Sequence, residues 1–239
     1  MKTFAKHTLI ALCMVFASVA AMHPAPTASP APTAAPAESA SEKQFVSSVT
    51  TDLQSRFATT DQAKAAGYFQ YTVEDQTGAI SWVNTQHWQS DQTHPSQLWY
   101  DVNGRLIGAD FSVLQSGSAA RPNLWGISPS RWLDFSPAHV HFAIKTASGL
   151  KYGGAGDKTM AKVGGSVSNP TAADVVKISK LKRWQKLGIP APASASDVAF
   201  VFQFPAIWDL QVWLVPNPLG AFAEHNPSVV PSAAAKDQD

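Results

Sequence analysis

The sequence predicts an α+β domain built on a mostly antiparallel β-sheet, with N-terminal helices and one helix inserted before the last two strands. Two observations lead to this class. Apolar residues recur with helical spacing at the start of the folded region and again near residue 175, and most other segments alternate apolar and polar residues. The alternating segments also follow one another at hairpin-length spacing, which favours antiparallel pairing over a parallel sheet with crossover helices.

Two helices are expected at the start of the domain. Ser41 and Gln44 have the spacing of a capping box that would begin the first helix. The apolar residues that follow share one helical face: Phe45, Val49, Leu53 and Phe57. Thr59 with Gln62 begins a second short helix, which Gly67 ends.

The segments of period two are expected to form the strands of the sheet. They are residues 68–73, 79–84, 97–102, 106–113, 138–145, 199–204 and 207–215. Asn103-Gly104 predicts a two-residue hairpin turn between the third and fourth of them, because both central residues of such a turn need a positive φ. A third helix is expected over residues 171–187, where Gly188 and Pro190 stop it.

The N-terminal region has the pattern of an export signal. Lys2 and Lys6 precede the apolar run 8–19, which is too short to span a bilayer, and small residues suit cleavage before Ala21. We therefore expect a signal peptide at 1–20, a disordered Pro/Ala/Ser/Thr tether at 21–41, a single globular domain at 42–231 and a disordered tail at 232–239. After removal of the signal no transmembrane segment is expected, and the protein is predicted to be periplasmic or secreted in a bacterium.

Composition narrows the classes of function. The only cysteine, Cys13, lies in the predicted signal, so the mature chain would be cysteine-free, without a disulfide or cysteine-bound zinc. The chain has 18 basic and 17 acidic residues, and loss of Lys2 and Lys6 leaves a net charge of about −1. Because a near-neutral surface does not attract a phosphate backbone, nucleic-acid binding is not expected.

The pair His139 and His141 is the clearest candidate for chemistry. Their strand alternates apolar residues with these histidines, so Val140 and its apolar neighbours should face the core and both imidazoles the opposite side. Two imidazoles on one face suit a divalent metal such as zinc or copper, with Asp209 as the candidate third ligand, or they can flank a small ligand. The alternative is that both histidines are polar residues on the wet side of an antiparallel sheet.

A second group of residues is expected to line a binding cleft. Asp209, Gln211 and Trp213 share one face of a late strand, opposite apolar residues. Trp88 and Trp132 lie near polar loop residues and suit a pocket for a planar or sugar-like ligand. The alternatives are that Asp209 and Gln211 are solvated and that the tryptophans pack in the core.

Several runs resemble one family. Residues 78–84, 95–100 and 209–214 stand in the same order as in a family of uncharacterised bacterial exported proteins, and the most specific motif is Asn-Pro-x-Gly-x-Phe-Ala-x-x-Asn-Pro at 217–227. The resemblance covers roughly residues 65–230 and implies export and a similar fold, but no known activity. This chain has Ser81 and Gln211 where the family pattern has histidine, so a site built from those histidines is not expected here in that form.

Three functions are compatible with these observations, and the sequence does not decide whether the protein is an enzyme. The first is an exported protein that binds a divalent metal or a small ligand through the two histidines. The second is a structural or envelope-interaction domain without catalysis, with exposed tryptophans that a partner covers. The third is a metal-assisted hydrolase, in which Asp209 or Glu224 is the general base toward a metal-bound water.

Overall fold

The computed structural model describes residues 34–115, 120–186 and 190–235. The predicted signal peptide, most of the predicted tether and the last four residues lie outside this range. The described residues form the predicted α+β fold, and every strand pair is antiparallel. No helix in this range is long and apolar enough to cross a membrane.

The larger sheet has six strands in the order β1-β2-β3-β4-β9-β5. They are β1 (Phe69–Gln70), β2 (Ile80–Val83), β3 (Gln97–Tyr100), β4 (Leu106–Leu114), β5 (Leu133–Phe135) and β9 (Ile207–Trp213). All except β5 lie within or close to segments that the alternation predicts. The three residues of β5 are too few to show a period.

A second sheet, which the sequence does not separate from the first, has the order β7-β6-β8. Its strands are β6 (His139–Thr146), β7 (Gly149–Ala155) and β8 (Val198–Phe204). The sequence pattern does not indicate β7, because this strand holds Gly153 and Gly154, and glycine is a poor strand former. The ring of Phe142 lies over Gly153, so that a Cβ there would approach Phe142 Cζ to 2.8 Å.

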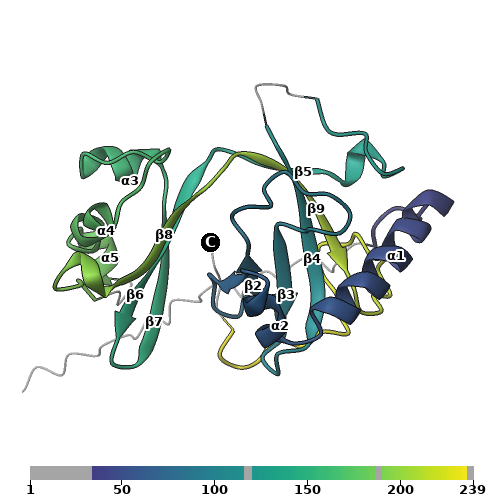
Figure 1. Ribbon diagram of the computed structural model, residues 1–239, viewed down its shortest axis with the longest axis horizontal. Helices are drawn as coiled ribbons and strands as arrows, with labels where there is room; N and C mark the ends of the chain where they lie inside the picture. Colours follow the sequence, from purple (N-terminus) through teal and green to yellow (C-terminus); the bar gives the residue numbers. More distant parts are fainter. Residues whose placement is uncertain (1–33, 116–119, 187–189, 236–239) are drawn as a thin grey trace, which may run out of the picture. The chain divides into compact units, whose positions relative to one another are not determined.

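The helical segment before the last two strands is divided into several short helices: α3 (Asp157–Lys162), α4 (Ala172–Ser179), α5 (Lys182–Lys186) and a 3₁₀ turn at Ala195–Asp197. The single helix predicted over 171–187 is therefore wrong in its length. Thr171 does begin α4 with a capping box that includes Asp174. These helices pack beside the smaller sheet (Figure 1), where Val175 and Ile178 join Val140 in one core cluster.

The first helix, α1 (Ala40–Arg56), begins two residues earlier than predicted. Its N-cap is Ser39, whose hydroxyl accepts from the Glu42 N–H at 3.2 Å, whereas Ser41 was expected to be the cap. The Glu42 carboxylate in turn accepts from the Ser39 N–H at 2.9 Å. The second helix, α2 (Thr60–Ala65), has the predicted capping box of Thr59 and Gln62.

The loop between β3 and β4 differs from the predicted two-residue turn. Gly104 has a φ of +75°, but the only described residue other than glycine with a positive φ is Trp125. The Asp101 carboxylate accepts from the N–H groups of Asn103 and Arg105, at 2.9 and 3.0 Å. A longer loop with one left-handed glycine is therefore closed by an aspartate side chain.

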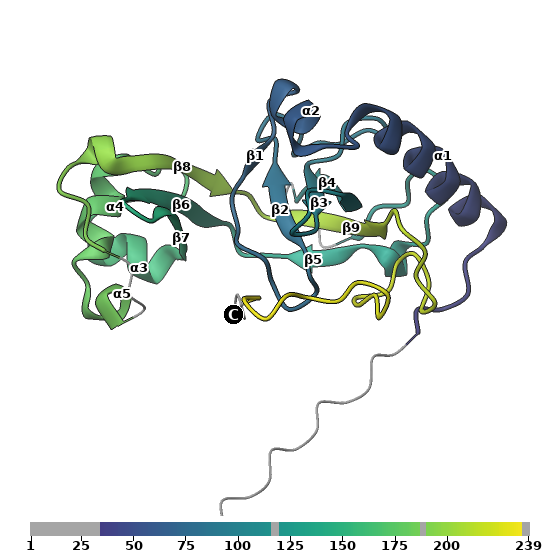
Figure 2. The ribbon, with the colours of Figure 1, turned by 90° about the horizontal axis from the view of Figure 1, so that it is seen from below.

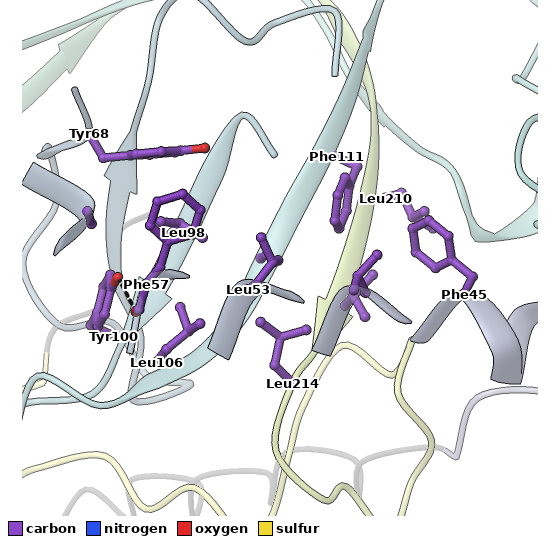
Figure 3. Packing of buried hydrophobic residues seen from close by; sticks show 14 of the residues in the cluster. Phe45, Leu53, Phe57, Tyr68, Leu98, Tyr100, Leu106, Phe111, Leu210 and Leu214 are labelled. Atoms are coloured by element: carbon purple, nitrogen blue, oxygen red, sulfur yellow. Dashed lines mark hydrogen bonds between the residues drawn. The ribbon is translucent and has the colours of Figure 1, made fainter. Parts of the chain in front are cut away.

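The apolar core of the larger sheet lies between this sheet and α1 (Figure 3). Phe45, Val49 and Leu53 of α1 pack on the face of β3, β4 and β9 that carries Leu98, Phe111 and Leu210. Figure 2 shows α1 on one side of this sheet and the C-terminal segment on the other. Val229 of that segment packs against Trp99 and Trp213, so the C-terminal segment covers part of the face opposite α1.

Two neighbouring chain segments join the sheets. The chain leaves the larger sheet after Phe135 and enters β6 at His139, and it returns from Phe204 of β8 to Ile207 of β9. β5 pairs with β9 and β6 pairs with β8, with His139 opposite Phe204. The connection therefore places the start of β6 next to the edge of the larger sheet.

The described ends of the domain are held by hydrogen bonds from both backbone and side-chain groups. Residues 34–39, which the sequence analysis assigned to the tether, contact the domain: the Ala35 N–H donates to Leu219 O at 2.8 Å, and Arg131 donates to Pro36 O at 2.8 Å. Arg131 belongs to a 3₁₀ turn at Pro129–Arg131. At the other end the Ser232 N–H donates to Glu74 at 2.8 Å.

Candidate functional site

The face of the larger sheet opposite α1 carries a group of buried polar side chains. Gln97, Asp110, Ser112 and Asp209 are each at most 4% exposed. In the strand register Asp110 lies opposite both Gln97 and Gln211, and Ser112 lies opposite Asp209. Four polar residues on neighbouring strands therefore form one continuous buried layer. Such a layer is uncommon unless its groups are hydrogen-bonded or await a ligand.

A cleft of about 890 Å³ opens over this face. Its lining includes Tyr71, Trp99, Asp110, Gln211 and Trp213 from the larger sheet and its flanking segment. His139, His141 and Phe204 contribute from the smaller sheet. A volume of this size, with aromatic walls and a few polar groups, suits a small-molecule ligand.

Two tryptophans on the cleft face are held in place by hydrogen bonds. Trp99 Nε1–H donates to Asp110 Oδ2 at 2.8 Å, and Trp213 Nε1–H donates to Ala223 O at 2.7 Å. Their rings meet edge to face with centroids 5.3 Å apart. The Trp99 ring lies over Gly108, where a Cβ would come within 2.0 Å of Trp99 Cε3. Glycine at position 108 is therefore required for this ring position.

Asp110 has one carboxyl oxygen without a partner. Oδ2 accepts from Trp99, whereas Oδ1 is buried and makes no hydrogen bond. Leaving a buried acceptor unsatisfied costs about 1–3 kcal/mol. Burial, and then the charge of the nearby Asp209, raises the pKa of Asp110 well above its usual value. The floor of the cleft thus contains an acceptor that a ligand can satisfy.

Asp209 is buried beside Asp110 and is the second acid of this face. Its Oδ1 accepts from Ser112 Oγ at 3.3 Å, and Ser112 Oγ also lies 2.5 Å from Ser96 Oγ. Burial raises the pKa of Asp209 to about 7, although hydrogen bonds from Ser112 and Gln211 act in the opposite direction. The charge that Asp209 carries when it is ionised therefore opposes ionisation of Asp110.

Tyr71 connects the acidic floor to the histidines. Its hydroxyl donates to Gln97 Oε1, and its ring meets the imidazole of His141 edge to face with centroids 4.9 Å apart. Burial raises the pKa of Tyr71 well above its usual value, so this hydroxyl keeps its proton.

The two histidines lie together, on the side that the alternation predicts. Val140, Phe142 and Ile144 point into the core of the smaller sheet, whereas the Nε2 atoms of His139 and His141 are 3.0 Å apart on the opposite side. His139 Nδ1 lies 3.2 Å from Pro137 O, which favours the Nδ1–H tautomer, so that His141 Nε2–H donates to His139 Nε2.

The histidine pair is partly buried among aromatic rings. His139 stacks on Phe204 and His141 on Phe202, with centroids 4.9 and 5.7 Å apart. Burial, and then the neighbouring His139, lowers the pKa of His141 to about 3. His141 is therefore neutral at physiological pH. Both histidines border the cleft and are not simply on a wet sheet face.

Four of the seven residues predicted for the site line the cleft: His139, His141, Gln211 and Trp213. Asp209 is on the same face but lies beneath it, bonded to Ser112. In the described ranges no three His, Cys, Asp or Glu side chains are grouped so as to hold a metal ion. The predicted three-ligand set of His139, His141 and Asp209 is therefore not assembled.

Two tryptophans predicted to line a pocket do not line this one. Trp132 is fully buried in the core under α1, where its ring packs 5.6 Å from that of Trp125. Trp88 packs on Phe204, with centroids 4.7 Å apart, outside the cleft lining. Both tryptophans follow polar loop residues in the sequence, but each ring packs against other aromatic rings, and the two do not form one pocket wall.

The residues at the centre of the site carry no motif that marks them in the sequence. Tyr71, Gln97, Trp99 and Asp110 were assigned to strands without a role. The available signal was the acid in the apolar run Leu-Ile-Gly-Ala-Asp-Phe, the same kind of signal that pointed to Asp209. Only the register of β3, β4 and β9 shows that the two acids share a face.

Comparison with known proteins adds no family to this description. No family model matches the chain, and no curated protein or solved structure matches it either. The chemistry of the cleft is therefore the basis on which a function can be argued.

Proposed function

We propose that this is an exported protein that binds a small molecule in the cleft on the polar face of the larger sheet. The observation that carries the proposal is the buried Oδ1 of Asp110, which has no partner and belongs to a residue at the cleft floor. A ligand that donates a hydrogen bond there removes an energetic cost that the free protein bears. His139 and His141 form one wall of the same cleft.

The two other functions have less support. An envelope-interaction domain was expected to expose tryptophans, but none of the eight tryptophans, all of them described, is among the exposed residues. A metal-assisted hydrolase needs a set of metal ligands with an open position, and the described acids and histidines do not supply three ligands at one point.

Native mass spectrometry of the protein purified from its own host tests the proposal. Ser81 lies on the cleft face of β2, so Ser81→Trp should fill part of the cleft. We expect a bound small-molecule mass on the natural protein that is absent from Ser81→Trp. Ser148→Trp, at an exposed position in the β6–β7 turn, is the matched control and should keep the mass. No bound mass on the natural protein, or equal occupancy in Ser81→Trp, would contradict the proposal.

Binding of a divalent metal at the histidine pair is a second candidate, favoured by the Nε2–Nε2 distance of 3.0 Å. Two imidazoles at about 2.0–2.1 Å from one ion, at about a right angle, are separated by about 3 Å, as in tetragonal copper sites. The contact of His139 Nδ1 with Pro137 O is the outer partner that such a ligand usually has. The remaining ligands would come from water or from the bound molecule.

Elemental analysis followed by titration with Cu²⁺ and Zn²⁺ tests this candidate. We expect about one equivalent of metal on the natural protein, lost in the double variant His139→Ala/His141→Ala, because this variant removes both imidazole ligands of the proposed site. His94→Ala, in an exposed loop, is the control and should bind as the natural protein does. Uptake that is unchanged in the double variant would place the metal elsewhere.

A further inference from the structure

We propose that the cleft selects a small organic cation, a primary ammonium or guanidinium compound, whose N–H groups donate to Asp110. The inference rests on the proposed function, that the cleft binds a small molecule, and adds the chemical class of that molecule. Three independent features of the described residues support it: the uncompensated acids of the floor, the direction of the hydrogen bonds around them, and the aromatic walls.

The acids of the cleft floor have no positively charged partner. Neither Asp110 nor Asp209 takes part in an ion pair in the described part of the chain. Arg131, the one arginine that lines the cleft, has its Nε 3.0 Å from Glu42 Oε1, and both side chains are almost fully buried. Because this guanidinium is already paired with Glu42, it is not available to the acids of the floor, and a cationic ligand would supply the positive charge that favours their ionised form.

The hydrogen bonds around the floor leave an acceptor free, not a donor. Trp99 Nε1–H is committed to Asp110, Ser112 Oγ–H to Asp209, and the Tyr71 hydroxyl to Gln97. At the floor, the buried atom without a partner is Asp110 Oδ1. Once Asp110 is ionised, this atom accepts and cannot donate, and a bound cation favours the ionised form. Ammonium and guanidinium groups are donors without acceptors, and their hydrogen bonds to carboxylates are among the strongest in proteins.

Aromatic side chains line the cleft near these acids. Tyr71, Trp99, Trp213 and Phe204 all border it, and Trp99 is hydrogen-bonded to Asp110 itself. A cation near the face of a tryptophan or tyrosine is attracted by the ring quadrupole, and the attraction grows as water is excluded. A carboxyl beside aromatic rings therefore favours a cation over a neutral molecule or an anion of the same size.

Three probes of matched size test the charge preference: benzylammonium, benzyl alcohol and benzoate, measured by isothermal titration calorimetry on the full chain. Benzylammonium is expected to bind at least about tenfold tighter than benzyl alcohol, because hydrogen bonds between charged groups are stronger than neutral ones. Benzoate is expected to give no binding heat, because its carboxylate meets the acids of the floor.

The variant Asp110→Asn assigns the preference to this carboxyl, since it keeps the shape and removes the charge. Benzylammonium binding should fall to the level at which benzyl alcohol binds the same variant. Asp134→Asn, an exposed acid on β5, is the control and should leave all three titrations as they are. If Asp110→Asn does not fold, Asp209→Asn removes the second charge of the floor and should reduce benzylammonium binding alone.

Two results would overturn the inference. One is benzyl alcohol or benzoate binding as tightly as benzylammonium, or no binding by benzylammonium at all. The other is a preference for benzylammonium that survives in Asp110→Asn. Neither result contradicts the proposed function, which the native mass spectrometry tests separately. The bound mass on the natural protein, and its loss in Ser81→Trp, do not depend on the charge of these probes.

Discussion

The two faces of β4 and β9 both carry deeply buried side chains, but burial has opposite effects on the stability of the two faces. Phe111 and Leu210, on the face under α1, are fully buried among other apolar residues. Asp110 and Asp209, their neighbours in sequence, are almost as buried on the opposite face and have no positive partner in any described ion pair. Apolar burial stabilises the fold, whereas burial of unpaired carboxyls opposes it.

The two faces of the larger sheet therefore contribute differently to the protein: one to its stability and the other to the cleft. Burial of apolar side chains on one face stabilises the fold. This stabilisation offsets the cost of the acids on the other face, which are unfavourable without a ligand. Proteins commonly carry such locally unfavourable arrangements at their functional sites.

The largest expected effect is on the apolar face. Phe111→Ala should lower the free energy of unfolding by about 3–5 kcal/mol, because it removes a fully buried ring and leaves a cavity. Urea denaturation followed by far-ultraviolet circular dichroism measures the change. Gln211→Ala, on the cleft face of β9, should cost less than about 1 kcal/mol. Equal losses in the two variants would contradict the division between the faces.

A gain in stability is expected on the cleft face. The folded state raises the pKa of Asp209 to about 7 from an ordinary value of 3.8. Between these values the folded chain holds a proton that the unfolded chain has lost, so stability falls as pH rises from about 4 to about 7. Asp209→Asn cannot ionise, and at about pH 8 it should be more stable than the natural protein by about 2–4 kcal/mol.

Urea denaturation at about pH 4, 6 and 8 checks this gain. The advantage of Asp209→Asn should become small at the lowest pH, where the folded carboxyl is protonated and the unfolded carboxyl is only partly ionised. Asp134→Asn is the control, and this exposed acid should show no gain at the highest pH. A loss of stability at all three pH values would mean that Asp209 is compensated in the folded protein.

A methyl group at position 108 should disturb the cleft face alone. Gly108→Ala places a Cβ at 2.0 Å from Trp99 Cε3, so the ring has to move and its bond to Asp110 is broken. We expect a loss of about 1–3 kcal/mol and a shift in tryptophan fluorescence. Gly156→Ala, where a Cβ would meet no atom within 4 Å, is the control. Unchanged fluorescence in Gly108→Ala would show that Trp99 is not held as described.

The smallest expected effect concerns the helix that covers the apolar face. Ser39→Ala removes the N-cap of α1 and should cost about 1 kcal/mol. Ser41→Ala removes a surface bond to Gly126 O and should cost less. Thermal unfolding of the two variants compares them. A larger loss of stability for Ser41→Ala than for Ser39→Ala would indicate that Ser41 is the N-cap of α1, as the sequence predicts.

Much of the fold could be predicted because the signals are local. The spacing of Phe45, Val49 and Leu53 indicated α1 and the face it buries, and the alternation around Val140 placed both histidines on the side opposite the core. The capping box at Thr59 was also correct. The alternation of apolar and polar residues did not indicate β5, which is too short to show a period, or β7, which is rich in glycine.

The sequence by itself determined the α+β class, the elements with clear periods and the meeting of His139 with His141, because neighbours on one strand face obey a period of two. The tertiary structure alone decided that the chain forms two sheets and that Asp110 lies in register between Gln97 and Gln211. It also buried Trp132 and set Asp209 beside Asp110, away from the histidines. These outcomes depend on which strands become neighbours, and no local pattern of residues encodes that choice.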